Sequence, residues 1–215
     1  MDVLVAGGHG QIALRLLKRL ADRGDRARGL IRNPDHAADL EAAGAVPVLC
    51  DLERDDPAPH LAGADAVVFA AGAGPGSGPE RKRTVDYGGA VKLIEAAQAL
   101  GVDRYVIVSS MGAGDPASAP EPMRAYQQAK HDADVALEGS GLAYTIVRPG
   151  HLTDDAATGR VAVAPSLGRT GDVTRDDVAD VLLAVLDTPT TAGLTFELLE
   201  GDMPVAAAVA GLAAS

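Results

Sequence analysis

Short apolar runs alternate along this 215-residue chain with longer segments in which apolar residues recur every three or four positions. The short runs have the length and apolar continuity of strands that are buried on both faces. We expect strands at Val3–Ala6, Arg28–Ile31, Val46–Cys50, Ala66–Ala70, Tyr105–Val108, Tyr144–Val147 and Thr195–Leu199. The three- and four-residue spacing predicts helices, most clearly at 12–20, 91–100 and 174–187.

The regular alternation of strand and helix predicts an α/β fold, a doubly wound parallel sheet with helices on both of its faces. No Pro/Ser-rich or low-complexity stretch divides the chain, so we expect residues 1–215 to form a single domain. The segments 111–123 and 151–172 are expected to be loops that form a small substrate-side portion. In such sheets ligands bind beyond the carboxyl ends of the strands, which directs attention to the residues that follow each strand.

The composition limits the classes of binding partner and the cellular compartment that we expect for this chain. The formal charge of −11 and the 3% aromatic content argue against a nucleic-acid partner, which requires clustered Lys and Arg or stacking rings. Cys50 is the sole cysteine, so neither an intramolecular disulfide nor a cysteine-based zinc site is expected, and we predict no metal. We see neither a signal peptide nor an apolar stretch of membrane-spanning length, and therefore expect a cytoplasmic protein without a membrane partner.

The first expected strand runs directly into glycines, in the sequence Gly7-Gly8-His9-Gly10-Gln11-Ile12-Ala13. A glycine turn that leads from a strand into a helix presents bare backbone N–H groups and the positive end of a helix dipole to an anion. Gly7 would allow the tight turn, Gly10 would let phosphates approach the backbone, and Ala13 would pack where helix meets strand. The alternative is a plain connecting turn. The expected dinucleotide-binding residues of this turn are Gly7, His9, Gly10, Gln11 and Ile12.

The residues after the second expected strand bear on which nicotinamide dinucleotide binds. NAD recognition usually places an acidic residue there, whereas NADP needs a cation for its additional phosphate. This strand ends in Arg32-Asn33-Pro34, without an acid, and the Arg32 guanidinium is suited to a phosphate. We therefore expect Arg32 and Asn33 to bind the cofactor and favour NADP over NAD; the alternative is that Arg32 is a solvated surface residue.

The next two expected strands end in residues that suit the adenosine half of the cofactor. Asp51-Leu52 follows the third strand, and the small residues Ala70-Ala71-Gly72 follow the fourth. Asp51 can accept a hydrogen bond from the adenine amino group, while the small residues leave space for adenosine. The alternative for Asp51 is a helix N-cap for the residues that follow it.

Candidate catalytic chemistry lies in Tyr126-Gln127-Gln128-Ala129-Lys130. A four-residue separation places Tyr126 and Lys130 on one face of a helix, where the ammonium group can stabilise a phenolate. Ser109 and Ser110 come at the end of the fifth expected strand, where a hydroxyl can hold a substrate oxygen while a tyrosine protonates it. The alternative is an exposed helix with an incidental tyrosine.

These motifs together resemble the short-chain dehydrogenase/reductase superfamily, and in particular its atypical NAD(P)-binding, NmrA-like and flavin-reductase-like members. The resemblance runs over nearly the whole chain. It rests on Gly7-x-x-Gly10-x-x-Ala13, Arg32-Asn33-Pro34, Asp51-Leu52, Ala70-Ala71-Gly72, Val108-Ser109-Ser110, Tyr126-x-x-x-Lys130 and Arg148-Pro149-Gly150. It implies a single NAD(P)-binding Rossmann domain in which Ser, Tyr and Lys act together.

By this resemblance, Ser110 would orient a substrate carbonyl and Tyr126 would be the general acid or base. Lys130 would bind the nicotinamide ribose and favour ionised Tyr126, and Pro149 would lie beside the nicotinamide. Ser109 is expected to contact the cofactor as well. His151 follows this segment, and we interpret it as a hydrogen-bonded structural histidine rather than a substrate contact.

The sequence thus predicts an NADP-dependent oxidoreductase that transfers a hydride between NADPH and a small carbonyl, quinone or flavin-type substrate. One alternative is a catalytically silent NADP(H)-binding redox sensor of the NmrA-like type; such proteins typically lack the Tyr/Lys pair. A scaffold role has little support, since we expect the apolar face of the helix at 174–187 to be core. The expected partner is a small-molecule substrate, and the sequence leaves homo-oligomerisation open.

Overall fold

A computed structural model of the protein describes residues 1–74 and 76–212. Its strands are β1 (Asp2–Ala6), β2 (Arg26–Ile31), β3 (Val46–Leu49), β4 (Ala66–Phe69), β5 (Arg104–Val108), β6 (Ala143–Pro149), β7 (His151–Thr153), β8 (Arg160–Ala164), β9 (Asp172–Thr174), β10 (Leu194–Glu200) and β11 (Met203–Pro204). Its α-helices are α1 (Gln11–Asp22), α2 (Ala37–Ala42), α3 (Ala58–Leu61), α4 (Pro79–Arg81), α5 (Ala90–Leu100), α6 (Glu121–Glu138), α7 (Arg175–Leu186) and α8 (Val205–Leu212). A π-helical segment, η2 (Lys82–Gly89), joins α4 to α5, and short 3-10 turns cover Pro34–His36, Met111–Gly114, Pro116–Ser118 and Pro189–Thr191.

Within these residues nine strands form one sheet, in the order β11-β8-β10-β6-β5-β4-β1-β2-β3. The seven strands from β10 to β3 are parallel, and β8 runs antiparallel to both β10 and β11 at the far edge. β7 and β9 pair separately. The chain runs outward from β1 through β2 to β3 and then returns to β4 on the other side of β1. The strand order therefore reverses between β1 and β4, and in such sheets the crevice at this reversal binds ligands.

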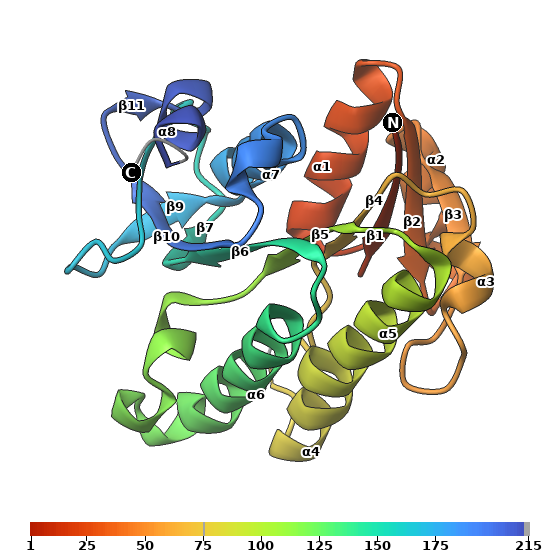
Figure 1. Ribbon diagram of the computed structural model, residues 1–215, viewed down its shortest axis with the longest axis horizontal. Coiled ribbons are helices and arrows are strands. Elements are labelled where there is room, and N and C mark those ends of the chain that lie inside the picture. The colour runs from red at the N-terminus through yellow and green to blue at the C-terminus, as the bar shows by residue number, and fades with distance from the viewer. Residues whose placement is uncertain (75, 213–215) are drawn as a thin grey trace.

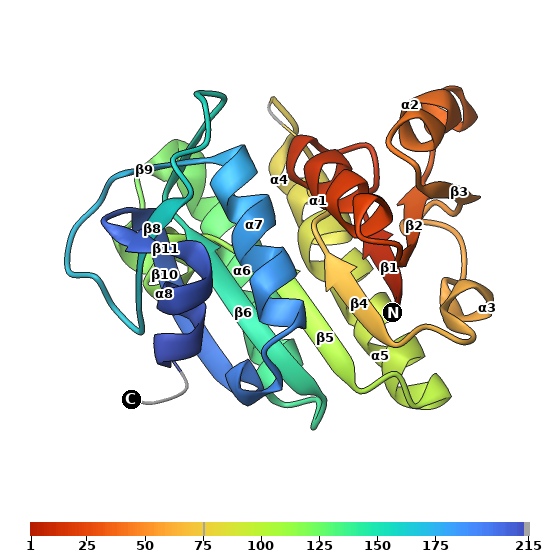
Figure 2. The same ribbon diagram turned by 90° about the horizontal axis from the view of Figure 1, so that it is seen from above.

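Helices cover both faces of the sheet, as the sequence predicts (Figures 1 and 2). In Figure 1, α1 and α7 lie above the sheet and α5 and α6 lie below it. Successive residues of β1 separate between these layers, because side chains along a strand alternate between its two faces. Val3 and Val5 pack with α1 and α7, whereas Leu4 and Ala6 pack with α5.

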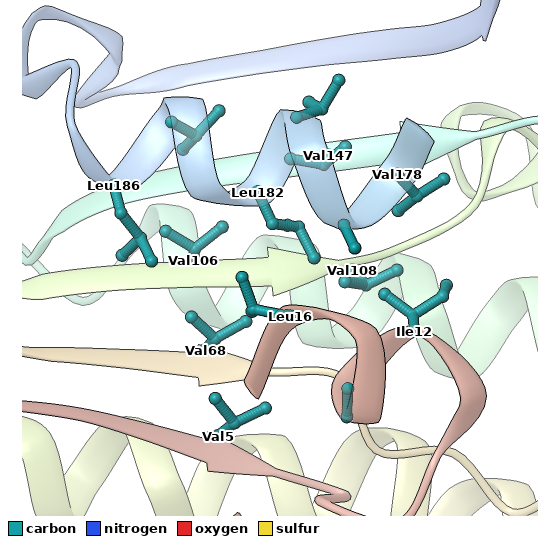
Figure 3. Packing of buried hydrophobic residues seen from close by; sticks show 14 of the residues in the cluster. Val5, Ile12, Leu16, Val68, Val106, Val108, Val147, Val178, Leu182 and Leu186 are labelled. Atoms are coloured by element: carbon teal, nitrogen blue, oxygen red, sulfur yellow. The ribbon is translucent and has the colours of Figure 1, made fainter. Parts of the chain in front are cut away.

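The core between the sheet and the upper helices is aliphatic (Figure 3). Leu16 of α1 and Leu182 of α7 are fully buried together with Val68 and Val106 of the sheet. The apolar face of α7 is therefore core, which confirms the expectation for this helix. Burial of both faces also explains the continuous apolar runs that mark the parallel strands in the sequence.

The expected strands and the three clearest helices are confirmed, with ends that shift by one or two residues in most cases. The expectation of a loop at 151–172 is wrong in part, because β7 and β8 lie within it and β9 begins at its end. The strands β7 and β8 gain their hydrogen bonds from partners later in the chain: β9 pairs with β7, and β10 and β11 pair with β8. In 111–123, two 3-10 turns precede α6, whose first turn takes the last residues.

No helix in the described ranges, 1–74 and 76–212, is both long enough and apolar enough to cross a membrane.

Candidate functional site

The glycine turn lies at the reversal point of the sheet, where β1 ends beside β4. Gly7 has φ +78°, a left-handed conformation that L-residues with side chains rarely adopt. A Cβ atom at Gly7 would lie 2.6 Å from the Cα atom of Ala71, and one at Gly8 would lie 2.9 Å from the Cα atom of Gly29. The turn thus passes against the backbone of two neighbouring segments, and glycine is required for that close approach.

Helix α1 begins directly after this turn with its first N–H groups open. Gly10 is the N-cap and supplies no side-chain hydrogen bond, and no acidic residue lies in the first turn of this fully described helix. The initial N–H groups of an α-helix lack partners within the helix, so they can bind an anion. The turn and α1 therefore fit the pyrophosphate of a dinucleotide.

Substituting Gly7 by alanine is expected to weaken dinucleotide binding by at least about tenfold, the equivalent of 1.4 kcal/mol. The added Cβ would both strain the positive φ and displace the backbone at Ala71. Isothermal titration calorimetry measures the affinity. Gly24→Ala is the matched control, since Gly24 also has positive φ (+88°) but its Cβ would meet no described atom within 4 Å. Equal affinities for the two variants would contradict the proposed role of the turn.

A cleft of about 310 Å³ opens at the carboxyl ends of β1, β2, β3 and β4. Most of the residues that the sequence assigns to the cofactor line it: Gly7, His9, Gly10, Arg32, Asp51, Leu52, Ala70, Ala71 and Gly72. The sequence interpretation did not include further lining residues, among them His36, Cys50, Glu53 and Arg81. Glu53 directly follows the Asp51-Leu52 motif, whereas Arg81 lies nine residues after Ala70-Ala71-Gly72, and the charge of each side chain was the available signal.

Three of the residues expected to bind cofactor have side chains engaged elsewhere. The side-chain oxygen of Gln11 accepts a hydrogen bond from Arg15 Nη1 at 2.7 Å, and Asn33 Oδ1 accepts one from the Asp35 backbone N–H at 3.1 Å. Ile12 packs into the hydrophobic core beneath α1. Gln11 and Ile12 can therefore contribute backbone N–H groups, while the Asn33 side chain caps the turn that begins α2.

Asp51 caps a turn as well as lining the cleft. Its Oδ1 accepts a hydrogen bond from the Glu53 backbone N–H at 3.0 Å, but the next helix starts only at Ala58, so Asp51 is not the N-cap of a helix.

Cys50, the residue before Asp51, is buried in the wall of the cleft. This burial raises the pKa of its thiol to about 11, with contributions from nearby carboxylates that include Asp51 and Asp55. Cys50 is therefore a neutral, inert wall of the cleft at physiological pH.

His9 is held at the edge of the cleft by two contacts. Its Nε2 lies 2.7 Å from Asp39 Oδ2, and its ring stacks on that of His36 with 3.6 Å between centroids. Both rings line the cleft, so the start of α1 and the turn before α2 meet there.

A second, wider cavity of about 760 Å³ lies at the carboxyl ends of β5 and β6. Ser110, Tyr126 and Pro149 all line it, and so does His151. Met111, Met123 and Gln127 add a mainly apolar wall with one amide. His151 Nδ1 lies 3.1 Å from Asp172 Oδ1, as expected for a hydrogen-bonded histidine, but the residue is exposed and lines the cavity.

Lys130 is buried between the two cavities, on the same helix as Tyr126. Its Nζ donates hydrogen bonds to the carbonyl oxygens of Val108 (3.1 Å) and Ala71 (3.4 Å) and lies 5.9 Å from the centre of the Tyr126 ring. It also forms an ion pair with Asp86 Oδ1 at 3.4 Å, and both side chains are at most 4% exposed. The amine thus joins the ends of β4 and β5 beneath the tyrosine.

Asp86 is a site residue that sequence reasoning missed. It lies in η2, whose π-helical turns carry its carboxylate inward, and its Oδ2 accepts a hydrogen bond from the Ala73 backbone N–H at 3.0 Å. Asp86 therefore connects the segment after β4 to Lys130 of α6. Its partner is 44 positions away in the sequence, and no local motif marks the pair.

Ser109 lies beneath the cavity rather than in it. Its hydroxyl donates a hydrogen bond to Asp134 Oδ2 at 2.8 Å, and Arg148 Nε donates to the same oxygen at 2.9 Å. Burial raises the pKa of Asp134, although Arg148 and the Ser109 hydrogen bond act in the opposite direction. The Ser109 hydroxyl therefore joins β5 to α6, and the expected contact of Ser109 with the cofactor stays a prediction.

The fold and the two adjoining cavities define a dinucleotide-binding protein of the Rossmann type. A family model for NAD(P)H-binding proteins matches residues 7–189, and the chain belongs to this family. The match agrees with the NAD(P)-binding family expected from the motifs.

Similar proteins have names that point to epimerase or oxidoreductase chemistry. The chain is 42% identical over 212 residues to Bacillus subtilis "Uncharacterized sugar epimerase YhfK", covering 97% of this chain and 99% of the relative. A solved structure from Bacillus halodurans, named as an NAD-dependent epimerase/dehydratase, is 42% identical with a TM-score of 0.95, over 99% of this chain and 100% of that one. The solved structure of the oxidoreductase ylbE from Lactococcus lactis is 26% identical with a TM-score of 0.89, and the match covers 100% of this chain and 98% of that one.

Proposed function

We propose that the protein is an NADPH-dependent oxidoreductase that reduces a small carbonyl, quinone or flavin-type substrate, with Tyr126 as the general acid. The observation that carries this proposal is the position of Ser110 and Tyr126 in one 760 Å³ cavity. Lys130 lies between that cavity and the cofactor cleft, because its Nζ bonds to the carbonyl of Ala71, a lining residue of the cleft. A cavity of this volume is within the usual range for small-molecule sites.

NADPH supplies a hydride when it is bound, and the chain supplies position and electrostatics. The Gly7–Gly10 turn and the first N–H groups of α1 would hold the pyrophosphate, and Arg32 would bind the additional phosphate. In the wider cavity, the Ser110 hydroxyl would hold the substrate oxygen. With a carbonyl substrate, as the carbon bonded to that oxygen gains the hydride, the Tyr126 hydroxyl would donate a proton to the oxygen and regain one from solvent.

Two observations support NADPH over NADH. Arg32 lines the cleft at the end of β2 and its side chain is 55% exposed, so its guanidinium group is accessible to a ligand, although it also lies 3.8 Å from Glu53. No acidic residue stands at the tip of β2, where NAD-binding proteins usually hold the ribose hydroxyls. The residues therefore fit a phosphorylated ribose.

Oxidation of NADPH, followed by absorbance against quinones, flavins, aldehydes and ketones, tests the proposal. We expect turnover of at least one acceptor, and a lower Kd for NADPH than for NADH in parallel titrations. Tight NADPH binding without turnover of any acceptor would contradict the reductase proposal and favour a silent NADP(H) binder. The names of the two 42% identical relatives make epimerisation a further alternative, and a sugar isomerised without net NADPH oxidation would favour it.

A further inference from the structure

Two arginine side chains from distant parts of the chain converge on one carboxylate oxygen in the cofactor cleft. Arg32 Nη1 lies 3.8 Å from Glu53 Oε2, and Arg81 Nη2 lies 3.4 Å from the same oxygen. All three residues line the cleft, with Arg32 following β2, Glu53 following β3 and Arg81 ending α4. A single anionic oxygen therefore lies between two guanidinium groups at the adenosine side of the cleft.

A hydrogen bond to the other oxygen of the Glu53 carboxylate holds it in this position. Thr84 Oγ1 donates a hydrogen bond to Glu53 Oε1 at 2.6 Å, which leaves Oε2 for the two arginines. Guanidinium pairs that converge on one group of oxygens are typical of phosphate recognition. The Glu53 carboxylate thus occupies the point where a bound phosphate would meet both cations.

We propose that Arg32, Glu53 and Arg81 form the site of the cofactor's 2′-phosphate, in which Arg81 is a second recognition residue and Glu53 an internal competitor. This proposal rests on the proposed use of NADPH. A phosphate monoester carries a charge of about −1.5 to −2 near neutral pH, against −1 for the carboxylate, so it binds the two arginines more strongly. Glu53 then lowers the affinity for the phosphate by its like charge, and the positive charge of Arg81 partly offsets this repulsion.

The same arrangement makes Glu53 a specificity residue. A ribose without the phosphate leaves the Glu53–arginine contacts intact and meets no repulsion from the carboxylate. Loss of the Glu53 charge should therefore strengthen binding of the phosphorylated ligand alone. Loss of the Arg81 charge should lower the affinity for the phosphorylated ligand for two reasons: one cation is removed, and the charge of Glu53 is less neutralised.

Calorimetric titration with adenosine 2′,5′-bisphosphate and with adenosine 5′-monophosphate tests the proposal without a substrate. For Arg81→Gln we expect the bisphosphate to bind about tenfold more weakly, the order of effect of one lost charge-assisted hydrogen bond. For Glu53→Gln we expect the bisphosphate to bind about threefold more tightly. The monophosphate should bind with unchanged affinity in both variants.

Arg54→Gln is the charge-matched control, because Arg54 is highly exposed and pairs only with Asp51, at 3.9 Å, among the ion pairs of the described residues. Thermal unfolding of each variant verifies that it is folded. If Arg81→Gln weakens both ligands equally, or Glu53→Gln fails to strengthen the bisphosphate, the proposed site is wrong while NADPH use stands. If the native protein itself binds the bisphosphate no more tightly than the monophosphate, NADPH use is wrong as well.

Discussion

Substitution of Tyr126 by phenylalanine is expected to lower kcat for NADPH oxidation by about 100- to 10,000-fold, the range for loss of a general acid. The change removes the hydroxyl from a residue that lines the wider cavity together with Ser110, and it keeps the ring. The packing around the ring should survive, including Lys82 Nζ at 5.1 Å and Lys130 Nζ at 5.9 Å from its centre. The Kd for NADPH should therefore remain close to that of the native protein.

Steady-state kinetics with an accepted quinone or carbonyl, together with calorimetric titration of NADPH, measure the two effects separately. Tyr144→Phe is the matched control, because Tyr144 is half-buried on β6 and lines neither cavity. Full activity of Tyr126→Phe would show that another group protonates the substrate. A loss of NADPH affinity as large as the loss of kcat would show instead that Tyr126 acts in cofactor binding.

The parallel part of the sheet could be predicted from sequence because most of its strands are buried on both faces. Runs such as Val3–Ala6 and Ala66–Phe69 are apolar throughout, and the helices between them have a clear three- and four-residue period. The antiparallel strand β8, which lies next to the edge strand β11, is only partly buried, and its hydrogen bonds come from β10 and β11, which follow it in the chain. The short β7 likewise depends on β9. Strands of this kind are formed by tertiary pairing, and their own residues carry a weak signal.

The candidate site likewise contains residues that a local sequence pattern identifies and residues that only the assembled fold brings together. Gly7, Arg32, Ser110 and Tyr126 each follow a strand or share a helix-face spacing, so a local pattern identified them, and the structure places each in one of the two cavities. Their supporting carboxylates were missed. Glu53, Asp86 and Asp134 meet their cations only after the strands and helices assemble, and an isolated acidic residue in a sequence more often faces solvent.

Asp86 and Asp134 connect helix α6 to the strand ends at the two cavities. Tyr126, Lys130 and Asp134 follow one another at four-residue intervals, so they lie on one face of the helix. Lys130 joins that face to Asp86 of η2 and to the carbonyls after β4 and at the end of β5. Asp134 joins it to Ser109 of the β5 end and to Arg148 of β6. The residues beside these anchors, Ser110 and Pro149, line the wider cavity.

Removal of the Asp134 carboxylate by substitution with alanine is expected to lower the free energy of unfolding by about 3–5 kcal/mol, the usual cost of breaking a buried ion pair. Asp134 is 1% exposed, and Arg148 is left with a mostly buried guanidinium group that has lost its ion-pair partner. Ser109 loses its acceptor at the same time. Urea denaturation at neutral pH measures the change. Asp132→Ala, on the same helix, removes a surface carboxylate bonded to Gln128 and should cost less than about 1 kcal/mol.

The pH dependence of the Asp134→Asn variant follows from the raised pKa of Asp134. Burial holds that pKa above its ordinary value of 3.8, so between the two values the folded protein binds more protons at this group than the unfolded chain does. The stability that the native protein draws from Asp134 is thus fully present below pH 3.8 and decreases as pH rises through the folded-state pKa. Asparagine does not titrate, so the difference in unfolding free energy between native protein and variant should narrow over this interval. A widening difference would contradict the dominance of burial.

A double substitution separates the loss of the ion pair from the loss of packing. Replacing both partners with apolar residues, as Asp134→Leu with Arg148→Met, removes the unpaired charge that makes Asp134→Ala costly, and such exchanges are often neutral or stabilising. We expect the double variant to recover most of the unfolding free energy but to keep a reduced kcat, because the ends of β5 and β6 lose their shared anchor on α6. If the double variant is less stable than Asp134→Ala, the loss of unfolding free energy arises from packing rather than from the unpaired charge of Arg148. If it is stable and fully active, the anchor has no part in positioning Ser110 and Tyr126.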